Sequence, residues 1–262
     1  MSYLHACVLG LLQGLAEFLP ISSSAHLTLA PWLLNWPDPG LTFDVALHAG
    51  TLVAIIAYFW RDWLDILGAS AANPSGPQAR LLGQLVVATI PGAVAGLILE
   101  KKAEEAFRNP ALIAGLLIVF ALLMEAADRY GRRSRSLTDF SWAGALFVGC
   151  AQALAIMPGV SRSGATLTAA LLLGLTRESA ARFSFLLATP IIAGAAAHKL
   201  RHLHGADLTG PFIAGVAVSA ISGLAAVSFF MAKIRTTGTR PYTIYRVALG
   251  LLVLAIWYRS AI

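Results

Sequence analysis

Six long apolar stretches constrain this 262-residue chain more than any other feature of its sequence. Each is close to the roughly 20 residues that a helix needs to cross the hydrocarbon core of a bilayer. Only 12% of the residues are charged, against about 25% in a soluble domain. The sequence therefore predicts an all-α integral membrane protein with a single membrane domain over 1–262. The six transmembrane helices are expected over 42–60, 81–100, 110–127, 179–198, 209–232 and 241–258.

Two further apolar segments are interrupted by polar residues. Residues 3–34 are broken at Pro20 and the serines that follow it, and residues 142–175 are broken at Pro158, Gly159 and the letters SRS. Irregular backbone at membrane depth persists only where it is buried in protein or lines a wet cavity. We therefore predict two re-entrant helix–turn–helix hairpins that share a polar interior.

The two interrupted segments also resemble each other. A shift of 139 residues aligns QGLAEFLPISSS (13–24) with QALAIMPGVSRS (152–163) without a gap, and five of the twelve positions are identical. Three spanning stretches follow each interruption, and this odd number makes the second half enter the membrane in the opposite sense. The pattern predicts an inverted-topology repeat with halves at about 1–128 and 137–262, and a site where the broken helices meet.

Basic residues lie mostly between the apolar stretches, which is typical of the positive-inside rule. We expect the loops 61–80, 128–141 and 233–240 to face the cytoplasm and both termini to lie outside. These loops hold Arg61, Arg80, Arg129, Arg132, Arg133, Arg135, Lys233, Arg235 and Arg240, whereas the opposite loops hold Lys101, Lys102, Arg108, Lys199 and Arg201. No basic face studded with aromatic residues accompanies the net charge of +6, so nucleic-acid binding is excluded.

Gln13 and Glu17 are the first polar pair within the apolar sequence. They are four residues apart, so they share one helix face. An ionisable residue at membrane depth is costly and is by default a functional candidate. The alternative is a purely structural ion pair between Glu17 and an arginine.

Three serines and a histidine follow in the same segment. The backbone N–H groups and the dipole at the start of a helix attract anions, and capping of the helix is the alternative role for the serines. His26 comes three residues after Ser23, so it lies over that hydroxyl and suits a base or a nucleophile. A satisfied core histidine is the alternative. The serines are Ser22, Ser23 and Ser24.

The second interruption supplies Ser161, Arg162, Ser163 and Thr166. The forked, permanently charged guanidinium of Arg162 suits phosphate oxygens, and Thr166 shares its helix face. Neutralisation of Glu17 is the alternative role for Arg162. Less informative are Asp44 and His48, which either support the site or cap a helix, and Arg246, which lies inside the last span.

An anion-binding helix end, an arginine, an acid and a base or nucleophile are together the parts of phosphoryl chemistry. A carboxylate beside phosphates also suggests a divalent cation, Mg²⁺ or Ca²⁺, on Glu17 and Gln13 and completed by the substrate's phosphates. A transporter or flippase for a polyprenyl phosphate is the other candidate, because inverted repeats with broken helices are a transporter architecture. The set of Glu17, Ser23 and His26 exceeds what a carrier requires, which favours catalysis.

The segments QGLAEFLPISSSAHL (13–27) and PGVSRSGAT (158–166) resemble the bacitracin-resistance family of undecaprenyl-diphosphate phosphatases. The resemblance implies a multi-pass enzyme of the bacterial cytoplasmic (inner) membrane that converts undecaprenyl diphosphate to the monophosphate carrier for peptidoglycan and other envelope polymers. It also implies dependence on a divalent cation and a site that faces the periplasm or the outside. The oligomeric state is not encoded in any motif, and a homodimer is left open.

The resemblance carries over residue by residue. It implies a catalytic set and a substrate-binding set, the latter including Ser24 where the family commonly has threonine. Gln13 stands where a second acid is also allowed, which makes the metal more dependent on Glu17. Water, Ser23 and His26 all remain candidates for the attacking group. The catalytic set is Glu17, Ser23, His26 and Arg162, and the substrate-binding set is Gln13, Ser22, Ser24, Ser161, Ser163 and Thr166.

Overall fold

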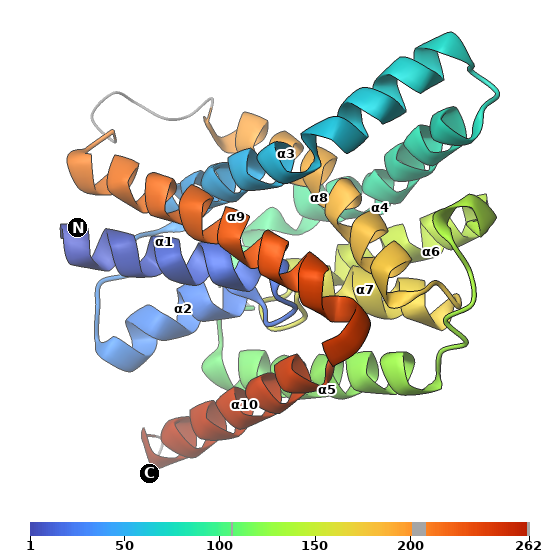
Figure 1. Cartoon of the computed structure of the whole chain (residues 1–262). Coiled ribbons are helices and arrows are strands. Elements are labelled where there is room, and N and C mark those ends of the chain that lie inside the picture. The colour runs from blue at the N-terminus through green and yellow to red at the C-terminus, as the bar shows by residue number, and fades with distance from the viewer. Residues whose placement is uncertain (106, 201–207, 261–262) are drawn as a thin grey trace.

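The computed structural model describes residues 1–105, 107–200 and 208–260, and these residues form an almost wholly helical protein (Figure 1). Two short 3₁₀ helices, η1 (Leu137–Asp139) and η2 (Leu154–Ile156), accompany the α-helices. The α-helices are α1 (Tyr3–Phe18), α2 (Ser23–Leu34), α3 (Leu41–Ala72), α4 (Pro77–Glu105), α5 (Pro110–Tyr130), α6 (Trp142–Ala153), α7 (Arg162–Leu172), α8 (Arg177–Leu200), α9 (Gly210–Thr237) and α10 (Arg240–Ser260).

Six of these helices, within the described ranges, are long and apolar enough to cross a membrane. They are α3, α4, α5, α8, α9 and α10. Each coincides with one of the six predicted spans, so the prediction of six transmembrane helices is confirmed at the level of length and composition.

The stretch 61–80, expected to be a loop, is largely helical. α3 continues to Ala72 with a kink at Phe59, whose φ of −98° and ψ of 19° are not helical. The charges of this stretch suggested a loop, but its apolar residues recur at helical spacing, and Ile66 is buried in the core while Trp63 packs against it. Figure 1 shows α3 and α4 projecting together as a result.

Four helices are too short to cross a bilayer, and they fall where the interrupted segments were identified. α1 and α2 have 16 and 12 residues, and α6 and α7 have 12 and 11, whereas a crossing takes about 20. α1 packs chiefly on α9, and α6 packs chiefly on α4. Both crossings are close, because a Cβ added at Gly10 of α1 would clash with the carbonyl oxygen of Gly215, and a Cβ at Gly149 of α6 would lie 2.5 Å from the carbonyl oxygen of Ala88.

The largest buried cluster draws residues from most of the helices, and part of it is a group of aromatic rings from α1, α8 and α9. Phe185 contacts Phe18 and Phe230 edge to face, with ring centroids 5.7 and 5.4 Å apart. Aromatic side chains bury more apolar area than other residues and gain from this geometry. Phe18 is also the last residue of α1, so the cluster fixes the point at which the first polar turn begins.

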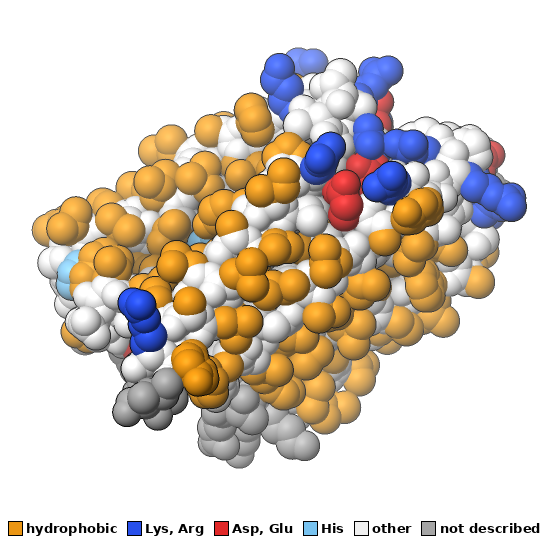
Figure 2. Space-filling view, turned by 90° about the horizontal axis from the view of Figure 1, so that it is seen from below, with side chains coloured by type: hydrophobic (Ala, Val, Ile, Leu, Met, Phe, Trp, Pro, Cys, Tyr) orange, Lys and Arg blue, Asp and Glu red, His pale blue; other side chains and the backbone are white. Residues whose placement is uncertain are grey.

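The connections expected to face the cytoplasm share one end of the protein. Arg177 donates two hydrogen bonds to Asp128, of 2.6 and 2.9 Å, and a third to the carbonyl oxygen of Arg235. Arg80 donates to the carbonyl oxygen of Phe140. Figure 2 shows most of the visible Lys and Arg side chains gathered at one end, while apolar side chains cover much of the remaining face. Of the opposite set, Arg201 lies outside the described residues, as do the side chains of Lys101, Lys102 and Lys199.

Candidate active site

The two polar turns, far apart in sequence, lie directly against each other. The backbone N–H of Gly159 donates to Ser22 Oγ at 3.1 Å. Arg246 of α10 is fully buried and donates to the carbonyl oxygen of Pro20 in one turn and to those of Gly159 and Val160 in the other, at 3.3, 2.7 and 3.1 Å. The sequence did not assign this role to Arg246, although a charged residue inside an apolar span was a signal of it.

Ser22 and Ser161 occupy equivalent places in the two turns. Each precedes the first residue of its helix, and each has a positive φ, of 76° and 69° respectively. Such a conformation costs about 1–3 kcal/mol for a residue with a side chain. Ser161 Oγ accepts from the N–H of Gly164 and so caps α7, whereas Ser22 Oγ accepts from the opposite turn.

Glu17 is the centre of the polar contacts. Its Oε1 accepts from Arg162 Nη2 at 2.6 Å, and its Oε2 accepts from Ser23 Oγ at 2.5 Å and from Gln13 Nε2 at 3.0 Å. The glutamate side chain is only 4% exposed. Three predicted site residues, drawn from both interruptions, therefore donate to the buried carboxylate of Glu17.

His48 adds a third segment to this centre. Its Nε2 lies 3.5 Å from Glu17 Oε2, and its Nδ1 donates to the carbonyl oxygen of Asp44 at 2.7 Å. The side chain is 28% exposed, so it borders the buried carboxylate on the more open side. The sequence identified Asp44 and His48 as a pair, but only His48 reaches Glu17. The Asp44 carboxylate lies 3.5 Å from Arg108, which also pairs with Asp38.

His26 is held by partners other than Ser23. Its Nδ1 donates to the carbonyl oxygen of Ser22 at 2.7 Å, and its Nε2 lies 2.7 Å from the hydroxyl of Tyr245. The hydroxyl of Ser23 is instead bonded to Glu17. Tyr245 was missed in the sequence, where its position beside Arg246 was the available signal.

Of the remaining predicted site residues, Ser24 bonds within its own turn, Ser163 reaches the opposite turn, and Thr166 bonds to α8 and within α7. Ser24 Oγ lies 3.4 Å from Ser22 Oγ, and Ser163 Oγ reaches the carbonyl oxygen of Leu19 at 3.5 Å. Thr166 is fully buried, and its hydroxyl lies 2.5 Å from Ser184 Oγ and 2.8 Å from the carbonyl oxygen of Arg162. These contacts stabilise the arrangement around Glu17 and Arg162.

Two polar atoms at this centre have no hydrogen-bond partner within the described part of the chain. They are Oε1 of Gln13 and Nη1 of Arg162. Buried polar atoms are nearly always paired in folded proteins, so an unpaired one needs a reason. Nη1 of Arg162 can donate to an anion, and Oε1 of Gln13 can accept from a donor or bind a cation.

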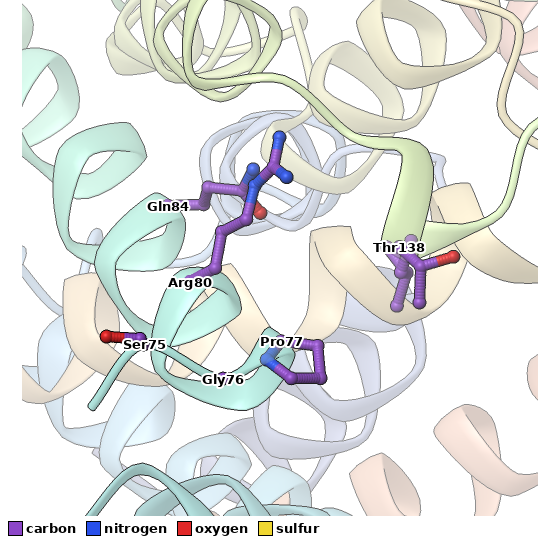
Figure 3. Close-up of a pocket in the computed structure, with 7 residues that line it drawn as sticks. Ser75, Gly76, Pro77, Arg80, Gln84 and Thr138 are labelled. Carbon is purple, nitrogen blue, oxygen red and sulfur yellow. The ribbon is translucent and has the colours of Figure 1, made fainter. Parts of the chain in front are cut away.

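Two surface cavities lie away from these contacts. One, of about 230 Å³, is lined by Ser75, Gly76, Pro77, Arg80, Gln84, Leu137 and Thr138. Figure 3 shows Arg80 and Gln84 rising from the same helix across from Thr138, and both donate to the carbonyl oxygen of Phe140. A second hollow, of about 420 Å³, is lined mainly by apolar residues of α3 and α8. Glu17 and Arg162 line neither, so the candidate site is defined by its polar contacts.

Comparisons with known proteins identify the family of this chain. The family model described as bacitracin resistance protein BacA matches residues 6–252. The chain is 51% identical over 258 residues to the undecaprenyl-diphosphatase of Moorella thermoacetica, covering 98% of this chain and 99% of that protein. It is 48% identical over 256 residues to the undecaprenyl-diphosphatase of Pelotomaculum thermopropionicum, covering 98% and 97% of the two chains.

Proposed function

The chain belongs to the family of the bacitracin resistance protein BacA, and we propose that it acts as an undecaprenyl-diphosphatase. It removes the terminal phosphate of undecaprenyl diphosphate and leaves undecaprenyl phosphate, the lipid carrier of envelope synthesis. The observation that carries this proposal is the contact between Glu17 and Arg162, which joins the two interrupted segments at 2.6 Å. The acid and the arginine of the proposed chemistry thus belong to one site.

Arg162 and two helix ends bind the diphosphate. Nη1 of Arg162 has no partner within the described residues, while Nη2 is held by Glu17. A phosphate oxygen satisfies the free Nη1 with a charge-assisted hydrogen bond. α2 begins at Ser23 and α7 begins at Arg162, so two helix N-termini direct their positive ends toward the same anion.

Ser23 is the attacking group that the contacts favour. Its hydroxyl donates to Glu17 at 2.5 Å, so Glu17 accepts the serine proton as Oγ attacks the terminal phosphorus. The Ser23 Oγ–P bond forms, the anhydride P–O bond breaks, and undecaprenyl phosphate leaves. Water then hydrolyses the phosphoserine and releases inorganic phosphate. Direct attack by water and attack by His26 are the alternatives.

A divalent cation fits the donor set in part. Oε1 of Gln13 has no partner among the described residues, and a carboxylate lies beside it. The described residues contain no cluster of three or more His, Cys, Asp or Glu that would form a cage. Mg²⁺ is commonly bound through one or two protein oxygens plus substrate phosphates and water. Gln13 and Glu17 would hold Mg²⁺ or Ca²⁺, which would neutralise phosphate charge.

The short helices act as two re-entrant hairpins of an inverted repeat with halves at about 1–128 and 137–262. The equivalent φ values of Ser22 and Ser161 support this proposal. So does the pairing of helices between halves, because α1 packs on α9 while its counterpart α6 packs on α4, the counterpart of α9. The corresponding helices α5 and α10, and α3 and α8, also pair with each other.

The proposed location is the bacterial cytoplasmic membrane, with the site open to the periplasm or the outside. The shared end of the basic connections supports this orientation through the positive-inside rule. A homodimer stays a prediction.

Phosphate release from undecaprenyl diphosphate by the purified protein, in detergent with Mg²⁺, tests the function. Glu17→Gln, Ser23→Ala and Arg162→Lys should each lower kcat by roughly 10²-fold or more, because each removes a group that acts on the reacting phosphate. Matched controls with surface partners are Glu178→Gln, Ser228→Ala and Arg235→Lys. Full activity in all three site variants would refute the site, and a wild type that binds the lipid but releases no phosphate would favour the transporter.

The attacking group is identified separately. With lipid labelled at the terminal phosphate, rapid quenching in denaturing detergent at neutral pH, where phosphoserine and phosphohistidine both survive, should trap label on Ser23, and Ser23→Ala should abolish it. Label on His26 would identify the histidine as nucleophile, and its absence from both would favour water.

A further inference from the structure

Tyr245 contacts the candidate site through His26 and is a residue that the proposed mechanism does not use. Its hydroxyl lies 2.7 Å from Nε2 of His26, and the two rings are nearly parallel, with an interplanar angle of 9° and centroids 5.6 Å apart. The tyrosine comes from α10, 219 residues after the histidine. This contact therefore depends on tertiary packing.

The partners of His26 determine which ring nitrogen carries its proton. Nδ1 lies 2.7 Å from the carbonyl oxygen of Ser22, and a carbonyl oxygen can only accept, so Nδ1 is the donor. A neutral imidazole has one N–H, so Nε2 is then an acceptor and the hydroxyl of Tyr245 is its donor. Tyr245 thus holds the lone pair with which His26 would act as a base or a nucleophile.

Arg246, the next residue in the sequence, fixes the position of Tyr245. Arg246 is fully buried and bonded to carbonyl oxygens of both polar turns, so α10 is tied to the site immediately beside the tyrosine. Tyr245 is 43% exposed, whereas His26 is 7% exposed. The phenol is therefore partly exposed, while the histidine behind it is buried.

We propose that Tyr245 is a positioning residue for His26, whose hydroxyl fixes the imidazole in the Nδ1–H form and sets the direction of Nε2. The kinetic part of this inference rests on the proposed function and on a catalytic role for His26. The proton arrangement of His26 does not, since it follows from the partners of the two ring nitrogens in the protein without substrate.

Tyr245→Phe removes the hydroxyl and keeps the ring. We expect kcat for undecaprenyl diphosphate to fall by about threefold to tenfold, the effect of one lost neutral hydrogen bond, with KM unchanged. Tyr242→Phe is the matched control, because Tyr242 lies one turn earlier on α10 and packs its ring on Phe230. Unchanged kcat in Tyr245→Phe, or a rise in KM alone, would overturn the positioning role.

A double-mutant cycle separates positioning from general damage to the fold. In a His26→Ala background, Tyr245→Phe should have no further effect on kcat, because the group through which it acts is gone. Multiplication of the two single effects would show that Tyr245 acts without His26 and would overturn the proposal.

The proton arrangement is measured directly in the wild type, and the measurement does not depend on activity. The protein has six histidines, and comparison of ¹⁵N-histidine spectra of the wild type and His26→Gln identifies His26. At about pH 8, above the usual histidine pKa, we expect a protonated Nδ1 and a hydrogen-bonded, unprotonated Nε2. A protonated Nε2 would overturn the inference whatever the activity. The expected spectrum in a protein that releases no phosphate would support the pairing and refute only the proposed function.

Discussion

Arg246 connects the two halves of the candidate site at a single residue. Its side chain is fully buried, and its three acceptors are backbone carbonyl oxygens of the two turns. Buried carbonyl groups left without a donor cost about 1–3 kcal/mol each. Both terminal nitrogens of Arg246 are thus bonded to the turns and only its Nε is unpaired in the described structure, whereas Arg162 has an unpaired Nη1 that can donate to a ligand.

Arg246→Met tests that division of roles. We expect the free energy of unfolding to fall by at least about 1–3 kcal/mol, seen as a lower melting temperature in detergent, with a parallel loss of phosphate release. Arg259→Met, at the exposed end of the same helix, is the control. A variant as stable as the control would mean that the turns are held together by other contacts.

A second prediction at the residue scale concerns the effect of substitutions at His48 on kcat. His48→Leu removes the polar group 3.5 Å from Glu17 Oε2 and should lower kcat roughly tenfold, because an apolar side chain then borders the buried carboxylate. His48→Gln retains a donor and should keep more activity than the leucine variant. His5→Leu, which alters a ring stacked on Trp36, is the control for loss of an imidazole. Equal activities of the leucine and glutamine variants would argue against a polar role.

At the scale of elements, local composition predicted where the helices lie better than it predicted which side chains of different helices contact each other. The apolar runs and the prolines located the six long helices and the two interruptions, because both signals lie within a few residues. The motifs also paired Glu17 with Arg162. The contacts of His48 and Tyr245 come from α3 and α10, and they depend on how whole helices cross, which no short pattern encodes. The extension of α3 was missed because its charges suggested a loop, although Ile66 is buried.

The prediction at the scale of elements concerns the close crossing of α6 and α4 and its effect on stability. Gly149→Ala places a Cβ 2.5 Å from the carbonyl oxygen of Ala88, so the helices must separate at a cost of about 1–3 kcal/mol. Gly96→Ala is the matched control on α4, where an added Cβ meets nothing within 4 Å and alanine favours the helix. Melting temperatures in detergent should fall for Gly149→Ala and stay level or rise for Gly96→Ala. The reverse order would contradict the close crossing.

At the scale of the whole molecule, the proposed orientation follows from the positive charge of the connections 61–80, 128–141 and 233–240 and from their position at the same end of the protein. Arg177 bonds both to Asp128, at the end of α5, and to Arg235, at the end of α9, so these helix ends face one side of the membrane together. In Figure 1 the two termini of the chain, at the start of α1 and the end of α10, lie toward the end of the protein opposite these connections. The site must be reached from that opposite side if the enzyme acts on lipid outside the cytoplasm.

Labelling in intact cells decides the orientation. In a chain with Cys7→Ser and Cys150→Ser, a single cysteine is placed at Ser134, between α5 and η1, or at Leu208, just before α9; both positions are exposed. A maleimide that does not cross the cytoplasmic membrane should label Leu208→Cys in intact cells and Ser134→Cys only after lysis, because the basic connections are retained inside. Phosphate release by both variants is the control for correct folding. Labelling of Ser134→Cys in intact cells, with protection of Leu208→Cys, would reverse the proposed topology and place the site on the cytoplasmic side.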